Sequence, residues 1–187
     1  MTEKRADEIK NVKRINRELR YQGAIVDFYA DTMLLPDGNT AVWDFIAHRK
    51  GAAATVAVLP DGKLLMVRQY RNAVERETLE IPAGSRDSKD EPFDQCAKRE
   101  LEEETGYRCK TLTHLLSIRT TVAFCNEQIE VYVAKDLEST KQHLDPDEYV
   151  AYEAYTVDEL CERIYDGTIQ DAKTIAAIMA YKNRYCD

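Results

Sequence analysis

The sequence has no apolar run approaching the length of a membrane-spanning helix, and its opening residues lack the pattern of a signal peptide. Its five cysteines are an odd number without paired ligand spacing, which argues against a disulfide framework and against a zinc site. From these absences we expect a cytoplasmic protein with reduced thiols and no membrane partner.

Basic residues are also few: 26 Lys and Arg stand against 34 Asp and Glu, giving a net charge of −8. A nucleic-acid surface needs basic patches to neutralise phosphates, so we expect no nucleic-acid partner. An anionic substrate would need local cations. With 187 residues, 44% of them hydrophobic, and no repeat or flexible linker, the chain suits one well-buried domain with a small appendage.

The most informative stretch runs from Gly84 to Tyr107. Proline is favoured in the first turn of a helix because its missing N–H has no partner there, so Pro92 predicts a helix start. Gly106 supplies the left-handed residue that ends helices. We therefore expect a helix from about Pro92 to Thr105, preceded by a glycine-bearing loop.

Helical periodicity places Glu100 and Glu104 among the apolar residues of this helix, whereas Arg99 and Glu102 fall on the water-facing side and Glu103 flanks the pair. Like charges four residues apart repel, and burial adds to the cost. A divalent cation between them offsets both terms, and carboxylate oxygens suit Mg²⁺ or Mn²⁺. A solvated acidic face is the alternative, but it explains only Glu102 well.

This stretch resembles the signature of the Nudix hydrolases, Gly-x5-Glu-x7-Arg-Glu-U-x-Glu-Glu-x-Gly-U, in which U is a bulky apolar residue. The match from Glu91 to Tyr107 has no gap. Upstream, six residues rather than five separate Gly84 from Glu91, so Asp90 is an alternative occupant of the first acidic position.

The resemblance implies the ligands of a metal site. Glu100, Glu104 and the backbone carbonyl of Ala83 would hold Mg²⁺, with Mn²⁺ as a substitute. Glu103 would be a bridging ligand or would position a metal-bound water. Backbone carbonyls are suitable ligands for hard cations.

Two neighbouring segments carry the substrate prediction. Arg71 closes a strand expected beside the acidic site, and a guanidinium is well shaped for two-point contact with phosphate. The Gln-Tyr-Arg segment ending at Arg71 and the Glu-Ile-Pro-Ala-Gly segment starting at Glu80 are similar to the ADP-ribose and nucleoside diphosphate-sugar branch. That resemblance implies that Arg71 contacts the phosphate or adenosine half and that Glu80 lines the pocket. The loop 122–127 lacks the proline typical of ADP-ribose pyrophosphatases, so GDP-mannose or another nucleoside diphosphate-sugar is an alternative substrate.

A further glutamate is expected from the loop 143–148, before a strand over 149–155. Related enzymes place a glutamate there, over the metals, as base or extra ligand. Glu148 matches that place best, and Glu153 is the alternative.

Residues 1–50 are expected to form an N-terminal β unit, because strands are predicted over 25–29, 32–35 and 40–45. Residues 1–20 have little apolar periodicity and predict a loose lead-in or a short surface helix. The only tryptophan, Trp43, would fill a small sheet core. The resemblance implies instead that Trp43 stacks on adenine and that this unit forms a homodimer.

Residues 51–187 are expected to form the Nudix domain, an α/β/α sandwich with a mixed sheet. Two separate strands are predicted over 111–116 and 117–121. A capping box at 156–159 starts a helix that ends at Gly167, and Asp171 caps a last helix with a core stripe of Ile175, Ile178, Met179 and Lys182.

The sequence thus predicts Mg²⁺-dependent hydrolysis of a nucleoside diphosphate-sugar, most simply ADP-ribose to AMP and ribose 5-phosphate. A non-catalytic nucleotide-sensing module is the alternative of another class. The complete set of glutamates argues against it.

Overall fold

The structure, a computed structural model, describes residues 9, 11–146 and 148–186. The chain divides into two compact units, one of residues up to 49 together with 121–127, the other of residues 50–120 and 128 onward. The loop 121–127 thus belongs with the N-terminal unit, which the sequence did not indicate. Within the described residues, no helix is long and apolar enough to cross a membrane.

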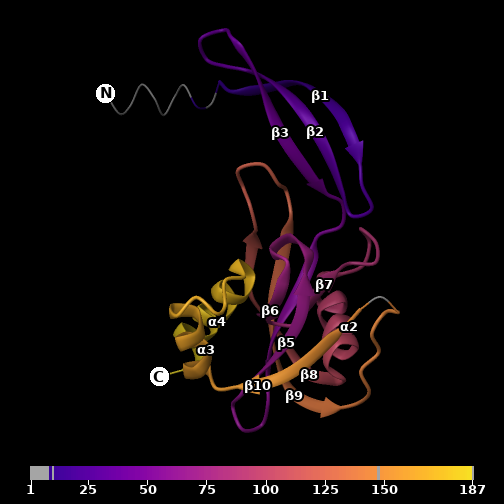
Figure 1. The fold of residues 1–187 in the computed structure, drawn as a ribbon, viewed down its shortest axis with the longest axis vertical. Helices are drawn as coiled ribbons and strands as arrows, with labels where there is room; N and C mark the ends of the chain where they lie inside the picture. Colours follow the sequence, from indigo (N-terminus) through magenta and orange to yellow (C-terminus); the bar gives the residue numbers. More distant parts are fainter. Residues whose placement is uncertain (1–8, 10, 147, 187) are drawn as a thin grey trace. The chain divides into compact units, whose positions relative to one another are not determined.

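The N-terminal unit contains a three-stranded antiparallel sheet in the order β1-β2-β3 (Figure 1). The predicted lead-in or helix is wrong for its later part, where β1 is a strand, and residues 1–8 and 10 lie outside the described residues. This strand is exposed along almost its whole length, so it lacks the apolar alternation that marks a half-buried strand. The expected break between the predicted strands 25–29 and 32–35 is also absent, because β2 is continuous. The strands are β1 (Lys13–Gln22), β2 (Val26–Leu34) and β3 (Thr40–His48).

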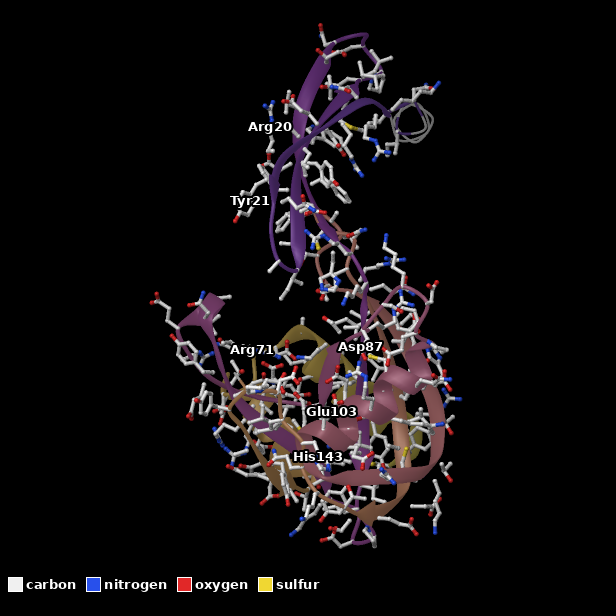
Figure 2. The ribbon with its side chains drawn as sticks, turned by 90° about the vertical axis from the view of Figure 1, so that its right-hand side faces the viewer. Arg20, Tyr21, Arg71, Asp87, Glu103 and His143 are labelled. Atoms are coloured by element: carbon white, nitrogen blue, oxygen red, sulfur yellow. The ribbon has the colours of Figure 1, made fainter. Side chains whose placement is uncertain are left out.

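An ion pair takes much of the place of an apolar core in this sheet. Arg17 donates from Nε and Nη2 to the Asp31 carboxylate at 2.7 and 2.6 Å, and its guanidinium lies 3.8 Å from the centre of the Phe45 ring. The hydrogen bonds from Arg17 lower the pKa of Asp31. Trp43 does not fill a sheet core, since it is 49% exposed. Tyr21, labelled on β1 in Figure 2, is also exposed.

The second unit is built on a mixed seven-stranded sheet in the order β10-β5-β4-β9-β8, with β6 paired to β5 and β7 paired to β4. β4 and β9 are parallel, and the other pairs are antiparallel. One strand with a register shift between His114 and Leu116 replaces the two strands expected over 111–121. The strands are β4 (Ala52–Val58), β5 (Leu64–Arg71), β6 (Arg76–Glu80), β7 (Ala83–Ser85), β8 (Tyr107–Arg119), β9 (Gln128–Ser139) and β10 (Val150–Tyr155).

Helices cover both faces of this sheet, which confirms the predicted sandwich (Figure 1). α2 (Phe93–Thr105) packs on one face through Ala97 and Leu101, against Ala53 and Leu65. α3 (Val157–Tyr165) and α4 (Ala172–Tyr185) pack on the other, where Ile178 is fully buried. A short 3₁₀ helix spans Asn72–Val74.

The predicted helix ends are confirmed. Gly106 takes a left-handed φ of 69° after α2, Thr156 and Glu159 form the capping box of α3, and Asp171 caps α4 by accepting from the Thr174 amide at 3.0 Å. The core stripe of α4 is only partly as expected. Lys182 forms an exposed ion pair with Asp158 at 2.8 Å and lies outside the core.

Candidate active site

The last turn of α2 and the short strand β7 bring two predicted ligands together. Glu104 is buried, with 4% of its surface exposed, and its carboxylate accepts a hydrogen bond from the Ala83 amide at 2.9 Å. β7 is held in the sheet by antiparallel pairing with β4. The backbone at Ala83 is therefore fixed directly beside the Glu104 carboxylate.

Gly84 makes room for Glu100, one turn earlier on α2. A β-carbon at position 84 would lie 2.1 to 2.2 Å from the carboxylate atoms of Glu100, well inside any permitted contact. The glycine of the signature is therefore needed here for close approach and not for a left-handed backbone.

The electrostatics of this pair fit a cation site. Burial is the main cause that raises the pKa of Glu104 to about 8 and that of Glu100 to about 7, and the charge of Glu148 contributes to both increases. In the part of the chain that the structure describes, no lysine or arginine forms an ion pair with Glu104. Two buried carboxylates with incomplete compensation are the donor set that a hard divalent cation such as Mg²⁺ would bind.

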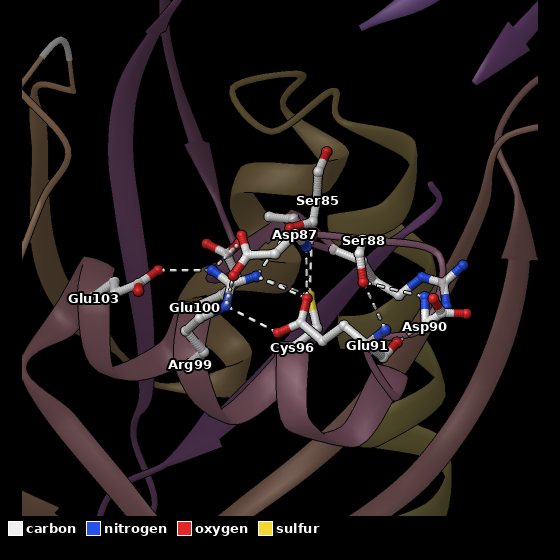
Figure 3. Close-up of polar contacts among 11 residues, drawn as sticks. Ser85, Asp87, Ser88, Asp90, Glu91, Cys96, Arg99, Glu100 and Glu103 are labelled. Carbon is white, nitrogen blue, oxygen red and sulfur yellow. Dashed lines mark hydrogen bonds and ion pairs between the residues drawn. The ribbon is translucent and has the colours of Figure 1, made fainter. Parts of the chain in front are cut away.

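Arg99 organises the remaining carboxylates (Figure 3). Its guanidinium donates from Nε to Glu91 at 3.0 Å and from Nη1 to Glu100 and Glu103, each at 2.8 Å. The predicted water-facing position of Arg99 is wrong: the side chain is 25% exposed and turns inward, because a long side chain reaches beyond the helix face that bears its Cα.

Of the two acidic residues that could fill the first position of the signature, Glu91 contacts Arg99 and Asp90 does not. The Glu91 carboxylate binds Arg99 and also accepts from the Asp87 amide at 2.7 Å, whereas Asp90 is exposed and hydrogen-bonds to Ser88 through its amide at 3.2 Å (Figure 3). Glu91 therefore takes the acidic position beside Arg99. There it orients the arginine.

The residue additional to the signature is accommodated in the turn that precedes α2. Arg86 donates from Nη1 to the carbonyls of Lys89 and Glu91 at 2.9 and 3.0 Å. The Ser88 hydroxyl accepts from the Glu91 amide at 3.2 Å. These hydrogen bonds close the turn directly before α2.

No three Asp, Glu, His or Cys side chains of the described ranges form a ready-made metal cluster. Glu100 and Glu103 instead share the Arg99 guanidinium. Cation binding by Glu100, Glu103 and Glu104 together would require these two carboxylates to turn from Arg99.

The loop that bears Glu148 is fixed to the end of α2. Gln142 donates from Nε2 to the carbonyls of Glu104 and Val150 at 2.6 and 3.0 Å, and the His143 amide donates to the Glu103 carbonyl at 3.0 Å. Glu148 is exposed and accepts within its own loop, yet its charge reaches Glu100 and Glu104. The structure thus brings Glu148 toward the two buried carboxylates. No motif in the sequence indicated the role of Gln142.

Glu153 lies elsewhere. It pairs across β10 and β5 with Met66, which packs into the core under α3 and α4. Its carboxylate accepts from Arg68 Nε at 3.2 Å and from the Tyr155 hydroxyl. Glu153 therefore occupies the sheet face opposite α2, and the geometry favours Glu148 over it.

Arg71 and Glu80, predicted to bind substrate, are bound to each other. Arg71 donates from Nε and Nη2 to the two Glu80 oxygens at 2.7 and 2.6 Å, and the charge of Glu104 helps to raise the pKa of Arg71. Arg71 is therefore a cation whose charge interacts with the acidic site. Figure 2, viewed from the α2 side, labels Arg71 and Glu103. Trp43 belongs to the N-terminal unit.

Lys173 completes the surroundings of Glu80 and was missed by the sequence analysis. Its ammonium donates to Glu80 and, at 2.9 Å, to Asp171. Lys173 lies four residues before Ala177 and eight before Tyr181, both buried, so a lysine within an apolar stripe was the available signal.

Comparison with known proteins identifies the family of the chain. Residues 48–178 match the NUDIX domain, and the chain belongs to the Nudix hydrolase family. It is 37% identical over 168 residues to an ADP-ribose pyrophosphatase of Bacillus subtilis (strain 168), covering 89% of this chain and 90% of that protein. It is 39% identical over 169 residues to the methanol dehydrogenase activator of Bacillus methanolicus, with the same coverage. A crystal structure of an ADP compounds hydrolase superposes with a TM-score of 0.84 at 19% identity, covering 95% and 97% of the two chains.

Proposed function

We propose that this Nudix hydrolase cleaves the pyrophosphate bond of a nucleoside diphosphate-sugar, with ADP-ribose giving AMP and ribose 5-phosphate. The observation that carries the proposal is the position of Arg71, whose pKa is raised in part by Glu104, beside two buried carboxylates with raised pKa values. An arginine beside an acidic, cation-binding pair suits a diphosphate, because the negatively charged oxygens of a diphosphate would contact both the guanidinium and a bound cation. The similarity to the Bacillus subtilis ADP-ribose pyrophosphatase supports ADP-ribose as the substrate.

Metal binding falls to Glu100, Glu104 and the Ala83 backbone, with Glu103 as a further ligand or as the group that orients water. Bound Mg²⁺, or Mn²⁺ in its place, would neutralise phosphoryl oxygens and lower the pKa of a water molecule. Glu103 is the most exposed of the three carboxylates, so it is the one that water reaches most readily.

Proton transfer falls to Glu148. Water attack on phosphorus requires removal of a proton, and an exposed carboxylate in the loop fixed to α2 by Gln142 is a suitable acceptor. Arg71 would hold the diphosphate, and Glu80 would keep the Arg71 guanidinium in one orientation.

The N-terminal β unit of residues 1–50 is proposed to form a homodimer and to contribute Trp43 as a stacking surface for the base. The support is an exposed apolar surface on a three-stranded sheet that has little core of its own. Among the described residues of this unit, the large apolar side chains with at least 48% exposure are Ile9, Ile15, Leu19, Tyr21, Ile25, Val42 and Trp43.

Turnover on a substrate panel tests the proposal. The protein is incubated with Mg²⁺ and ADP-ribose, GDP-mannose, UDP-glucose or NADH, and a coupled phosphatase releases phosphate from monoester products. We expect the highest kcat/KM with ADP-ribose. A profile led by GDP-mannose would retain the hydrolase and replace the substrate, and binding without turnover of any compound would favour the nucleotide-sensing alternative.

A further inference from the structure

Arg71 belongs to a group of four charged side chains, two of which, Glu80 and Lys173, are buried. Glu80 is almost fully buried, with 2% of its surface exposed, and contacts two cations: Arg71 through both oxygens and Lys173 through Oε2. Lys173, whose side chain is 9% exposed, also contacts Asp171. The Thr78 hydroxyl donates to Glu80 at 2.7 Å. Every oxygen of Glu80 is thus bound.

The four charges cancel. Arg71 and Lys173 carry two positive charges, and Glu80 and Asp171 carry two negative ones. A buried carboxylate with one partner removed keeps its desolvation cost and loses part of its compensation. Without Lys173, Glu80 would share its charge with Arg71 alone, and the group would have a net negative charge beside the site for an anionic substrate.

The first turn of α4 holds Lys173 in place. Asp171 caps the helix and at the same time accepts from Lys173. The neighbouring Thr174 accepts from the Ile81 amide at 3.1 Å, immediately after Glu80. The helix start is therefore fixed to the end of β6, and the ammonium reaches Glu80 from a defined direction.

We propose that Lys173 is a positioning residue for substrate binding: through Glu80, it fixes the Arg71 guanidinium and leaves its charge available to the diphosphate. This inference rests on the proposed function. Lys173 contacts no substrate in this scheme. Its removal should weaken binding through Arg71 and leave Glu100, Glu104 and Glu148 unaffected.

The test compares the wild-type protein with Lys173→Met and Lys173→Arg. Kinetics with ADP-ribose are combined with calorimetric titration of a non-hydrolysable α,β-methylene analogue. Lys173→Met should raise KM and the analogue Kd about ten- to a hundredfold while kcat changes less than about threefold, because a displaced binding group acts mainly on substrate affinity. Lys173→Arg keeps the charge and should retain more affinity than Lys173→Met.

Lys182→Met is the matched control on the same helix. Lys182 pairs with Asp158 at the surface, where the two side chains are 40% and 87% exposed, so its loss should leave KM, Kd and kcat unchanged. A folded Lys173→Met protein with wild-type KM and Kd would overturn the inference.

A double variant, Glu80→Gln with Lys173→Met, covers the case in which the single variant fails to fold. It removes one charge of each sign and leaves the group neutral, so it should bind better than Lys173→Met and more weakly than wild type. A double variant with wild-type affinity would contradict the proposal. If the proposed function is wrong, the wild-type protein itself will turn over no nucleoside diphosphate-sugar. The analogue titrations will still measure the effect of Lys173 on binding, so the two failures can be distinguished.

Discussion

Gly84 and Glu100 fit against each other so closely that a β-carbon at position 84 would force the Glu100 carboxylate to move. A β-carbon at Gly84 would meet the Glu100 carboxylate at 2.1 to 2.2 Å. The position of this carboxylate therefore depends on the absence of a methyl group on β7.

Gly84→Ala should lower kcat about a hundredfold, because displacement of a catalytic group by about 1 Å has an effect of that order. Steady-state kinetics with ADP-ribose measure this. Gly38→Ala is the control: Gly38 has a positive φ of 84° and no atom near a new β-carbon, so that variant should lose some stability and keep its kcat. Equal kcat in the wild-type and Gly84→Ala proteins would contradict the arrangement described for Glu100.

Glu104→Gln should stabilise the metal-free protein while abolishing its response to Mg²⁺. Because the pKa of Glu104 is raised to about 8, the wild-type carboxylate must take up a proton on folding at neutral pH, whereas a glutamine needs none and keeps an acceptor for the Ala83 amide, so the gain should be about 1–3 kcal/mol. Thermal unfolding with and without Mg²⁺ measures both effects. Glu102→Gln is the matched control on α2, since Glu102 pairs with Arg108 at the surface, and it should keep the Mg²⁺ response. Loss of the response in both variants would argue against a specific role for Glu104.

Glu148→Gln should reduce kcat about a hundred- to ten-thousandfold, the usual contribution of a general base. Glu153→Gln should leave kcat within about twofold, because Glu153 lies on the other sheet face with Arg68. Single-turnover kinetics at saturating Mg²⁺ distinguish the two. The reverse pattern would assign the base to Glu153.

Glu80 should make the free energy of unfolding decrease at acidic pH. Burial alone would raise its pKa, but the hydrogen bonds from Arg71 and the charge of Lys173 lower it to about 2 from 4.5. The unfolded chain therefore binds more protons between these values, so the contribution of about 3 kcal/mol is present above pH 4.5 and is lost as the pH falls toward 2. Urea unfolding between pH 2.5 and 6 should show a shallower pH dependence for Glu80→Gln than for wild type. Equal slopes would contradict the lowered pKa.

Trp43 should report base binding directly, because it is the only tryptophan. Stacking on an adenine should quench its fluorescence when AMP or ADP-ribose is added, and Trp43→Ala should weaken binding by about 1–3 kcal/mol. Ribose 5-phosphate, which has no base, is the control ligand and should leave the emission unchanged. Absence of quenching at saturating AMP would remove Trp43 from the base site.

The features that could be predicted from sequence are those set by local spacing. The helix stop at Gly106, the burial of Glu104 and the cap at Asp171 depend on residues within a turn of one another, so periodicity and capping rules identify them. The α/β/α sandwich with a mixed sheet could be predicted because strands flank two helical regions.

The errors arose where tertiary contacts decide. β1 has no buried stripe, since it is an edge strand exposed on both faces, and its pairing with β2 is visible only in the fold. Lys173 meets Glu80 across 93 residues of sequence. The sheet face of Glu153 depends on which residue of β5 it pairs with, and this register is not encoded in the local pattern, whereas Glu148 lies in the loop before β10.

The closed turn before α2 offers a place for a chemical reporter. Arg86 holds the carbonyls on either side of Asp90, and Lys89 is exposed and contributes its backbone carbonyl to the turn. A fluorophore or spin label attached at Lys89 would therefore sit on the loop that leads from Gly84 to the signature helix, without displacing Glu100 or Glu104. The fluorescence or electron-spin signal of such a probe would report cation or substrate binding at the neighbouring carboxylates.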